Sequence, residues 1–152
     1  MADPIVSPPT LQGFIAWAYA VMGIPTTAMS PDDPGWEYAY IVAVDLVPTD
    51  FANTLKDIYT LTVYNWAGSQ LLQFQQDYPG QTFFTAARQA YGINNFIAGV
   101  VTSASDVSTS ETLTVGEGLQ NLGLLDLQRI KDPYGRQAVA FMQTLGTLWG
   151  LT

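Results

Sequence analysis

The longest uninterrupted helical pattern in the chain runs from Asp50 to Gln75 and changes character along its length. In its first half, residues that suit a core recur at spacings of three and four, which is the period of one helix face. These positions are Phe51, Leu55, Ile58, Tyr59 and Thr62. In its second half, apolar residues occur on all sides. A helix of this kind enters a core or an interface, so we expect it to be the central helix, capped by Thr49.

Two other helices are predicted from an aspartate followed by a proline, at Asp33-Pro34 and Asp132-Pro133. Aspartate accepts hydrogen bonds from the first free amides of a helix, and proline suits the first helical position. The first of these helices ends before Pro48. Its core-facing positions are Trp36, Tyr40, Ala43, Val44 and Val47, with Tyr38 and Ile41 outside that face. The closing helix has apolar positions at Tyr134, Ala138, Phe141, Leu145, Leu148 and Trp149.

Three shorter helices complete the helical prediction. The first runs from Thr10 to Met22 and stops at Gly23. Its apolar face is formed by Leu11, Phe14, Ile15, Ala18 and Met22, and Trp17 and Tyr19 lie outside that face, where they predict a second covered surface. The others are Phe83–Tyr91, which Thr82 opens and Gly92 ends, and Leu122–Lys131.

The remaining segments lack helical periodicity. Residues 1–9 contain three prolines and predict an extended N-terminal arm. Residues 93–101 fit a short helix or a strand equally well. Residues 102–115 are rich in Ser and Thr and predict one long polar loop or a small β-hairpin. The predicted fold is therefore mostly α: one domain over residues 1–152, with five or six helices bundled around a long central helix and extended terminal arms.

Composition points away from nucleic-acid binding and towards protein contacts. Apolar residues make up 48% of the chain, whereas charged residues are only 12%, about half of the usual share. The net charge is −8, and the five basic residues are scattered, so no basic face can neutralise phosphates. The continuous apolar part of the first helix, Phe14–Ile24, is about half of the ~20 residues that a membrane span needs. We therefore expect no membrane association.

The sequence offers few parts for catalysis. It has no His and no Cys, which removes the commonest general base and the commonest soft metal ligands. Among the acids, Asp32 and Asp33 flank a helix start, and Asp50 and Asp57 share a solvated helix face. Asp106 lacks the spacing of a calcium loop. We predict no catalytic residues, no cofactor site and no metal site, and hence no enzyme.

Aromatic side chains at the edges of helices are better candidates for function, because Trp and Tyr commonly anchor protein interfaces. For these aromatics, core packing and an interface remain equally good interpretations. A loop as long as residues 102–115 in a compact domain also tends to be functional or disordered. The candidate interface residues are Trp17, Tyr38, Ser105, Asp106, Ser108, Thr109, Trp149 and Leu151.

Three stretches together resemble a known class of proteins: Tyr59–Phe74, Phe96–Val115, and Leu125–Gln137 with the closing Trp149–Leu151. In this order they are similar to small virion proteins of tailed bacteriophages from the head–tail joining module, above all head–tail connector or adaptor proteins. The resemblance covers roughly residues 50–152 and rests on general pattern. It implies a mostly helical subunit without catalytic residues.

The resemblance also implies partners and location. Connector subunits assemble, commonly as twelve copies, into a ring beneath the portal protein, and tail or nozzle proteins dock below. The ring extends the channel through which DNA passes without specific binding. The protein would be assembled in the host bacterial cytoplasm and reside in the virion. Alternatives are a tail-completion, decoration or minor head protein, a carboxylate-dependent hydrolase using Glu37, Glu111 or Glu117, and a small-molecule carrier.

Overall fold

The computed structural model describes residues 7–50, 52–94, 103–105, 110–112 and 129–144. This part of the chain is all-α, with five α-helices and one π-helical segment, apart from a short antiparallel pair in which Ser103 lies opposite Thr112. The elements are α1 (Leu11–Trp17), η1 (Ala18–Met22), α2 (Pro34–Leu46), α3 (Lys56–Phe74), α4 (Phe83–Tyr91), β1 (Ser103–Ser105), β2 (Ser110–Thr112) and α7 (Pro133–Thr144). The predicted helical bundle is confirmed at this level. The predicted helix Leu122–Lys131 lies outside the described residues up to position 128, as do residues 95–101.

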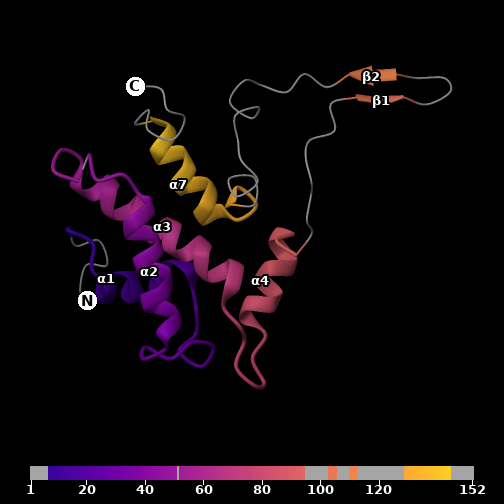
Figure 1. Cartoon of the computed structure of the whole chain (residues 1–152). Coiled ribbons are helices and arrows are strands. Elements are labelled where there is room, and N and C mark those ends of the chain that lie inside the picture. The colour runs from indigo at the N-terminus through magenta and orange to yellow at the C-terminus, as the bar shows by residue number, and fades with distance from the viewer. Residues whose placement is uncertain (1–6, 51, 95–102, 106–109, 113–128, 145–152) are drawn as a thin grey trace.

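The central helix is α3, and the other helices of the bundle pack against it (Figure 1). From Tyr59 to Ser69 all its residues are buried except the half-buried Leu61, which confirms that its second half runs inside the core. The prediction of its start is wrong. The helix begins at Lys56 rather than Asp50, because residues 52–54 form a turn in which the Ala52 amide bonds to the Thr49 carbonyl. Thr49 therefore does not cap α3, and Leu55 is exposed.

Both predicted aspartate–proline helix starts are confirmed. The Asp33 carboxylate accepts a hydrogen bond from the Gly35 amide at 2.8 Å, and α2 begins at Pro34. The Asp132 carboxylate accepts one from the Gly135 amide at 2.7 Å, and α7 begins at Pro133. These caps satisfy amides that no carbonyl of the same helix can reach.

The first helix also begins as predicted, at the Thr10 cap, but its second half is a π-helix. Gly23 ends it in the left-handed conformation at φ 69°. Trp17 lies outside the predicted apolar face and is nevertheless only 2% exposed. Its ring lies 6.0 Å from that of Tyr64 in α3 and 5.9 Å from that of Tyr134 in α7. The second surface predicted for this helix is therefore covered within the chain.

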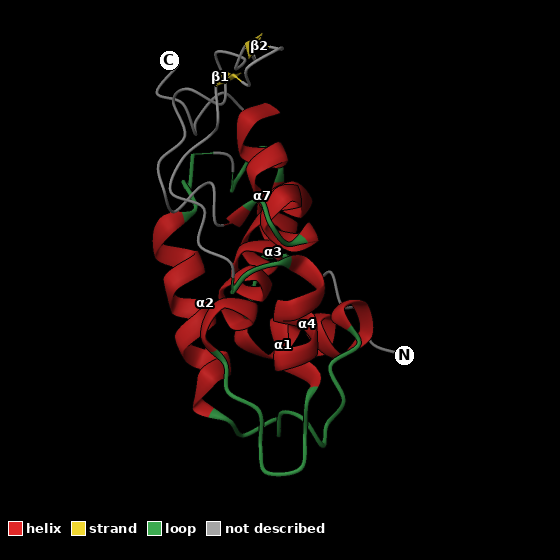
Figure 2. Ribbon diagram, turned by 90° about the vertical axis from the view of Figure 1, so that its right-hand side faces the viewer, coloured by secondary structure: helices red, strands yellow, loops and turns green. Residues whose placement is uncertain are grey.

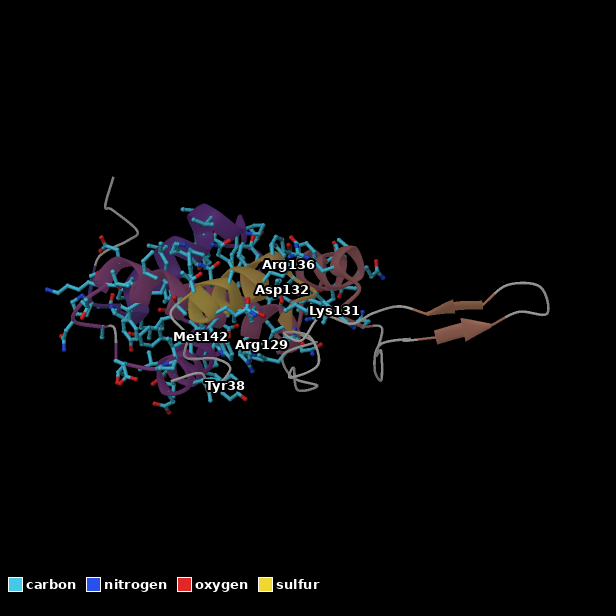
Figure 3. The ribbon with its side chains drawn as sticks, turned by 90° about the horizontal axis from the view of Figure 1, so that it is seen from above. Tyr38, Arg129, Lys131, Asp132, Arg136 and Met142 are labelled. Atoms are coloured by element: carbon cyan, nitrogen blue, oxygen red, sulfur yellow. The ribbon has the colours of Figure 1, made fainter. Side chains whose placement is uncertain are left out.

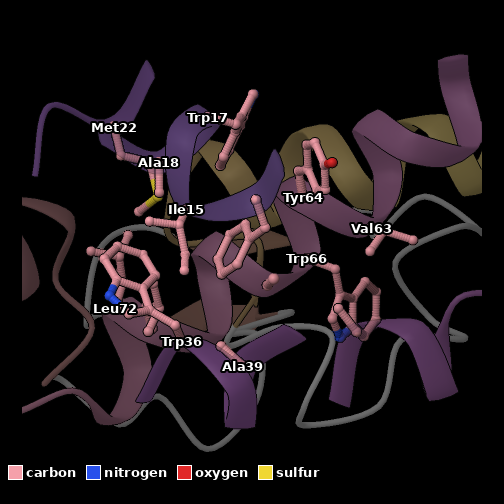
Figure 4. Packing of buried hydrophobic residues seen from close by; sticks show 14 of the residues in the cluster. Ile15, Trp17, Ala18, Met22, Trp36, Ala39, Val63, Tyr64, Trp66 and Leu72 are labelled. Atoms are coloured by element: carbon pink, nitrogen blue, oxygen red, sulfur yellow. The ribbon is translucent and has the colours of Figure 1, made fainter. Parts of the chain in front are cut away.

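Aromatic rings from α1, α2 and α3 meet in the core (Figure 4). Phe14 is fully buried, and its ring lies 5.7 Å from that of Trp36 and 6.0 Å from that of Tyr64. Edge-to-face and tilted arrangements of this kind add to the free energy gained by burial alone. Three chain segments that are distant in sequence are thus joined at one point.

The connection from α3 to α4 is fixed by polar contacts. Arg88 donates to the carbonyls of Leu72 and Gln75, which end α3. The Asp77 carboxylate accepts from the amides of Phe84 and Thr85 at the start of α4. Burial by itself would raise the pKa of Asp77, but these amides, the Thr85 hydroxyl and the charge of Arg88 lower it. The side chain that caps α4 is therefore Asp77, whereas Thr82 at the predicted start makes no capping hydrogen bond.

The last residues of the predicted N-terminal arm are held on the bundle. Ser7 donates from its hydroxyl to Asp57 in α3, and Tyr40 in α2 donates to the Pro9 carbonyl at 2.8 Å. These contacts tie residues 7–9 to two helices at once. Within the described residues no helix combines the length and the apolar character needed to cross a membrane.

Candidate interaction surface

The outer face of α2 carries three of the five large apolar side chains that are exposed in the described part of the chain. Tyr38, Ile41 and Leu46 are 54%, 49% and 55% exposed. Because residues four apart lie one above the other on a helix, Tyr38, half-buried Val42 and Leu46 form one row along α2. We call the set Tyr38, Ile41, Val42 and Leu46 the outer α2 face.

The opposite face of the same helix accounts for its place in the fold. Trp36, Ala39, Ala43 and Val47 are buried against α1 and α3. A helix on the surface of a globular protein normally has one apolar face and one polar face, whereas α2 is apolar on both. In Figure 2, α2 lies along the left side of the bundle and α3 lies in its middle. Packing among the described residues accounts for the inner face of α2 but not for the outer one.

One neighbouring aromatic extends the outer α2 face towards α3. The ring of Tyr38 meets that of Phe74 edge-on at 4.8 Å, and Phe74 is itself only partly buried. Figure 3, seen from above, shows Tyr38 at the margin of the molecule. A tyrosine ring that already packs against a second ring loses little conformational freedom on binding. This is the property of a good interface anchor.

Acidic side chains accompany this apolar surface. Glu37, Ile41 and Asp45 form the row beside Tyr38, Val42 and Leu46, and both acids are exposed. The first 55 residues contain six acids and neither Lys nor Arg. The outer α2 face is therefore apolar with an acidic margin.

The structure separates the residues that the sequence placed together as interface candidates. Trp17 belongs to the core and Tyr38 to the surface. Ser105 lies in β1. Asp106, Ser108, Thr109, Trp149 and Leu151 lie outside the described residues. Ile41 and Leu46 were not among the candidates, although the position of Ile41 outside the predicted core face was a usable signal.

A second cluster, between α3 and α7, is polar and buried. The Ser69 hydroxyl donates to one carboxylate oxygen of Asp132 at 2.8 Å, and the other oxygen accepts from the Gly135 amide. Close by, the Arg129 guanidinium lies 4.0 Å above the Trp66 ring and donates to the Gln70 side chain at 2.7 Å. We call this cluster the α3–α7 polar seam; Figure 3 labels Arg129 and Asp132 within it.

Burial affects both the pKa and the possible role of the Asp132 carboxyl group in this seam. Asp132 is 0% exposed, and desolvation raises its pKa, against the opposing effect of the hydrogen bonds from Gly135, Ser69 and Tyr134 and of the Arg129 charge. A perturbed carboxyl group in a cleft would be a candidate acid or base. This carboxyl group has no exposed surface and caps a helix, so its role is structural.

The other carboxylates that the sequence raised as candidates are separate from one another. Asp33 caps α2 and also accepts from the Tyr78 hydroxyl, and Asp57 accepts from Ser7. Glu37 is exposed on α2, Glu111 belongs to β2, and Glu117 lies outside the described residues. Across the described ranges, no group of three or more acidic side chains is arranged to hold a metal ion.

Comparison with known proteins adds no relative: no family model, no curated protein and no solved structure matches this chain. The outer α2 face therefore stands on its own geometry and charge.

Proposed function

We propose that this protein is a structural virion subunit, a head–tail connector or adaptor that assembles into a ring below the portal protein of a tailed bacteriophage. The single observation that carries the proposal is the outer α2 face, an apolar surface that is exposed in the described part of the fold. Protein interfaces are rich in Tyr and apolar anchors of this kind. The resemblance of residues 50–152 to connector proteins supplies the specific role.

The composition of the chain agrees with this role. A ring is closed by heterologous contacts, so every subunit needs two different complementary patches, in addition to surfaces for portal and tail proteins. Low charge content makes such extensive contacts cheaper to desolvate. A net charge of −8 suits a channel that DNA passes without being held. In this proposal the ring holds about twelve copies and the protein has no catalytic step.

Native mass spectrometry of the purified chain, alone and with its portal protein, tests the proposal. We expect a complex with about twelve copies of the 16.5 kDa chain to form with portal. The matched variant Ile41→Ser should reduce that complex, and Val21→Ser, at an equally exposed apolar position in η1, should not.

Two results would contradict the adaptor role. A chain that ignores both portal and tail proteins is not a connector. A copy number in the hundreds per particle assigns the protein to decoration of the head instead.

A further inference from the structure

We propose that the outer α2 face docks a basic amphipathic helix of a partner protein. The inference rests on the proposed function only in using the same surface, and it adds the chemistry of the occupant. The occupant is a helix because the surface is a narrow strip along one helix, and helices commonly bind such strips through residues at spacings of three and four.

The arrangement of side chains sets what the partner must present. The row Tyr38, Val42 and Leu46 offers three apolar positions, one per turn. The adjacent row places Ile41 between two exposed acids, Glu37 and Asp45. Eight residues separate these acids, which corresponds to about 12 Å along the helix axis. A partner helix that carries Lys or Arg two turns apart, beside an apolar stripe, matches both rows.

A second copy of this chain does not supply that pattern, because no described helix carries more than one basic residue: Lys56 in α3, Arg88 in α4 and Arg136 in α7. Arg88 donates to the carbonyls that end α3, Arg136 lies against the carbonyls of Ile130 and Lys131, and Lys131 itself bonds to the Gly92 carbonyl. Arg129 is buried against Trp66. Charge complementarity therefore favours a partner of opposite sign.

Two designed helical peptides with the same leucine stripe test the proposal. One has Lys flanking the stripe and the other has Glu, and both carry a fluorophore for anisotropy measurements with the full chain. We expect the Lys peptide to bind, and to bind more weakly as salt is raised. The Glu peptide should bind at least about tenfold more weakly, because like charges oppose each other across the contact.

Variants locate the binding to α2. Ile41→Ser and Leu46→Ser should each lower the affinity for the Lys peptide about tenfold, and Val21→Ser should leave that affinity unchanged. The pair Glu37→Gln and Asp45→Asn should remove most of the salt dependence. Its control, Gln12→Lys with Gln89→Lys, makes the same change in net charge at exposed positions elsewhere and should leave binding within about twofold of wild type.

Three outcomes would overturn the inference. Equal binding of both peptides would mean that the outer α2 face binds apolar surfaces regardless of their charge. Failure of both peptides, with self-association that Ile41→Ser abolishes, assigns the face to a second copy. If neither peptide binds and Ile41→Ser lowers the melting temperature as much as a core substitution does, the outer α2 face packs against other residues of this chain. If the portal complex forms through α2 while the Lys peptide fails, only the partner class is wrong and the adaptor role stands.

Discussion

The α3–α7 polar seam and the outer α2 face depart from the usual pattern in opposite directions. The seam buries a carboxylate, a hydroxyl and a guanidinium, whereas the outer α2 face exposes a tyrosine, an isoleucine and a leucine. In the seam, both oxygens of Asp132 have hydrogen-bond donors in the same chain. Such a buried group is accounted for by folding. The outer α2 face has no comparable account within the described residues, and that difference is why function is assigned to the apolar surface.

Trp17 and Tyr38, both predicted as interface residues, provide the sharpest contrast between a buried and an exposed aromatic side chain. Trp17→Ala should lower the free energy of unfolding by about 3–5 kcal/mol, because it leaves a large cavity between α1, α3 and α7. Tyr38→Ala should lower it by only about 1 kcal/mol, because the ring is half-exposed and its edge-to-face contact with Phe74 is lost. Urea unfolding followed by circular dichroism measures both. A large loss for Tyr38→Ala would show that the outer α2 face is part of the core.

The close contact between Gly135 in α7 and the backbone of Arg129, three residues before the Asp132 cap, gives the next prediction. A Cβ added at Gly135 would lie 2.0 Å from the Arg129 carbonyl oxygen, which is backbone and cannot move aside cheaply. Gly135→Ala should therefore destabilise the protein by about 2 kcal/mol or more, although alanine favours helix by about 1 kcal/mol. Gln137→Ala, exposed on the same helix, is the control for thermal unfolding and should be neutral. An unchanged melting temperature for Gly135→Ala would contradict this close approach.

The Asp132 carboxylate predicts a difference between two substitutions. Asp132→Ala removes the cap of α7 and leaves the Ser69 hydroxyl without its acceptor, at a cost of about 2 kcal/mol. Asp132→Asn keeps a capping oxygen and should cost less than half as much. Equal losses for the two variants in urea unfolding would contradict the capping role.

The same residue predicts the direction of a pH effect. Burial raises the pKa of Asp132 in the folded state above its ordinary value of 3.8. Its contribution to stability is thus fully present below about pH 3.8 and declines as the pH rises through the folded pKa. Asp132→Asn should abolish this decline, so wild type should gain relative to the variant as the pH falls. Parallel pH profiles of unfolding for the two proteins would show that Asp132 carries no such shift.

Substitution of the outer α2 face should produce the smallest change in stability. The triple variant Tyr38→Ser, Ile41→Ser and Leu46→Ser removes three half-exposed side chains and with them the edge-to-face contact between Tyr38 and Phe74. We expect its melting temperature to stay within a few degrees of wild type, while its complex with portal is lost. A fall as large as that of Gly135→Ala would mean that this surface belongs to the fold.

The sequence predicted local structure better than tertiary placement. The helix starts at Asp33 and Asp132 depend on a capping carboxylate and a proline that lie within four residues of each other in sequence. Both predictions are confirmed. The start of α3 was misplaced because apolar spacing continues through residues that form a turn. Trp17 was placed outside the apolar face because the spacing pattern defines only one such face, whereas the structure covers this helix on two sides. Only the packing of α3 and α7 around α1 reveals that second covering.

For the candidate site, the sequence identified Tyr38 but not its neighbours. Ile41 was placed correctly outside the core face, yet Leu46 gave no separate signal, because an apolar residue near a helix end fits either face. The joining of Ser69 to Asp132 could not be foreseen either, since local spacing carries no information about residues 63 apart in sequence.

That same distance along the chain has a consequence for synthesis on the ribosome. Ser69, Trp66 and Gln70 in α3 emerge well before Arg129 and Asp132, which cover them in the finished fold. Until α7 has left the ribosome, α3, which has more buried residues than any other described helix, has one uncovered side. Nascent chains in that interval expose the kind of surface that chaperones recognise and that aggregates. Rapid docking of the closing helix therefore protects the protein while it is being made.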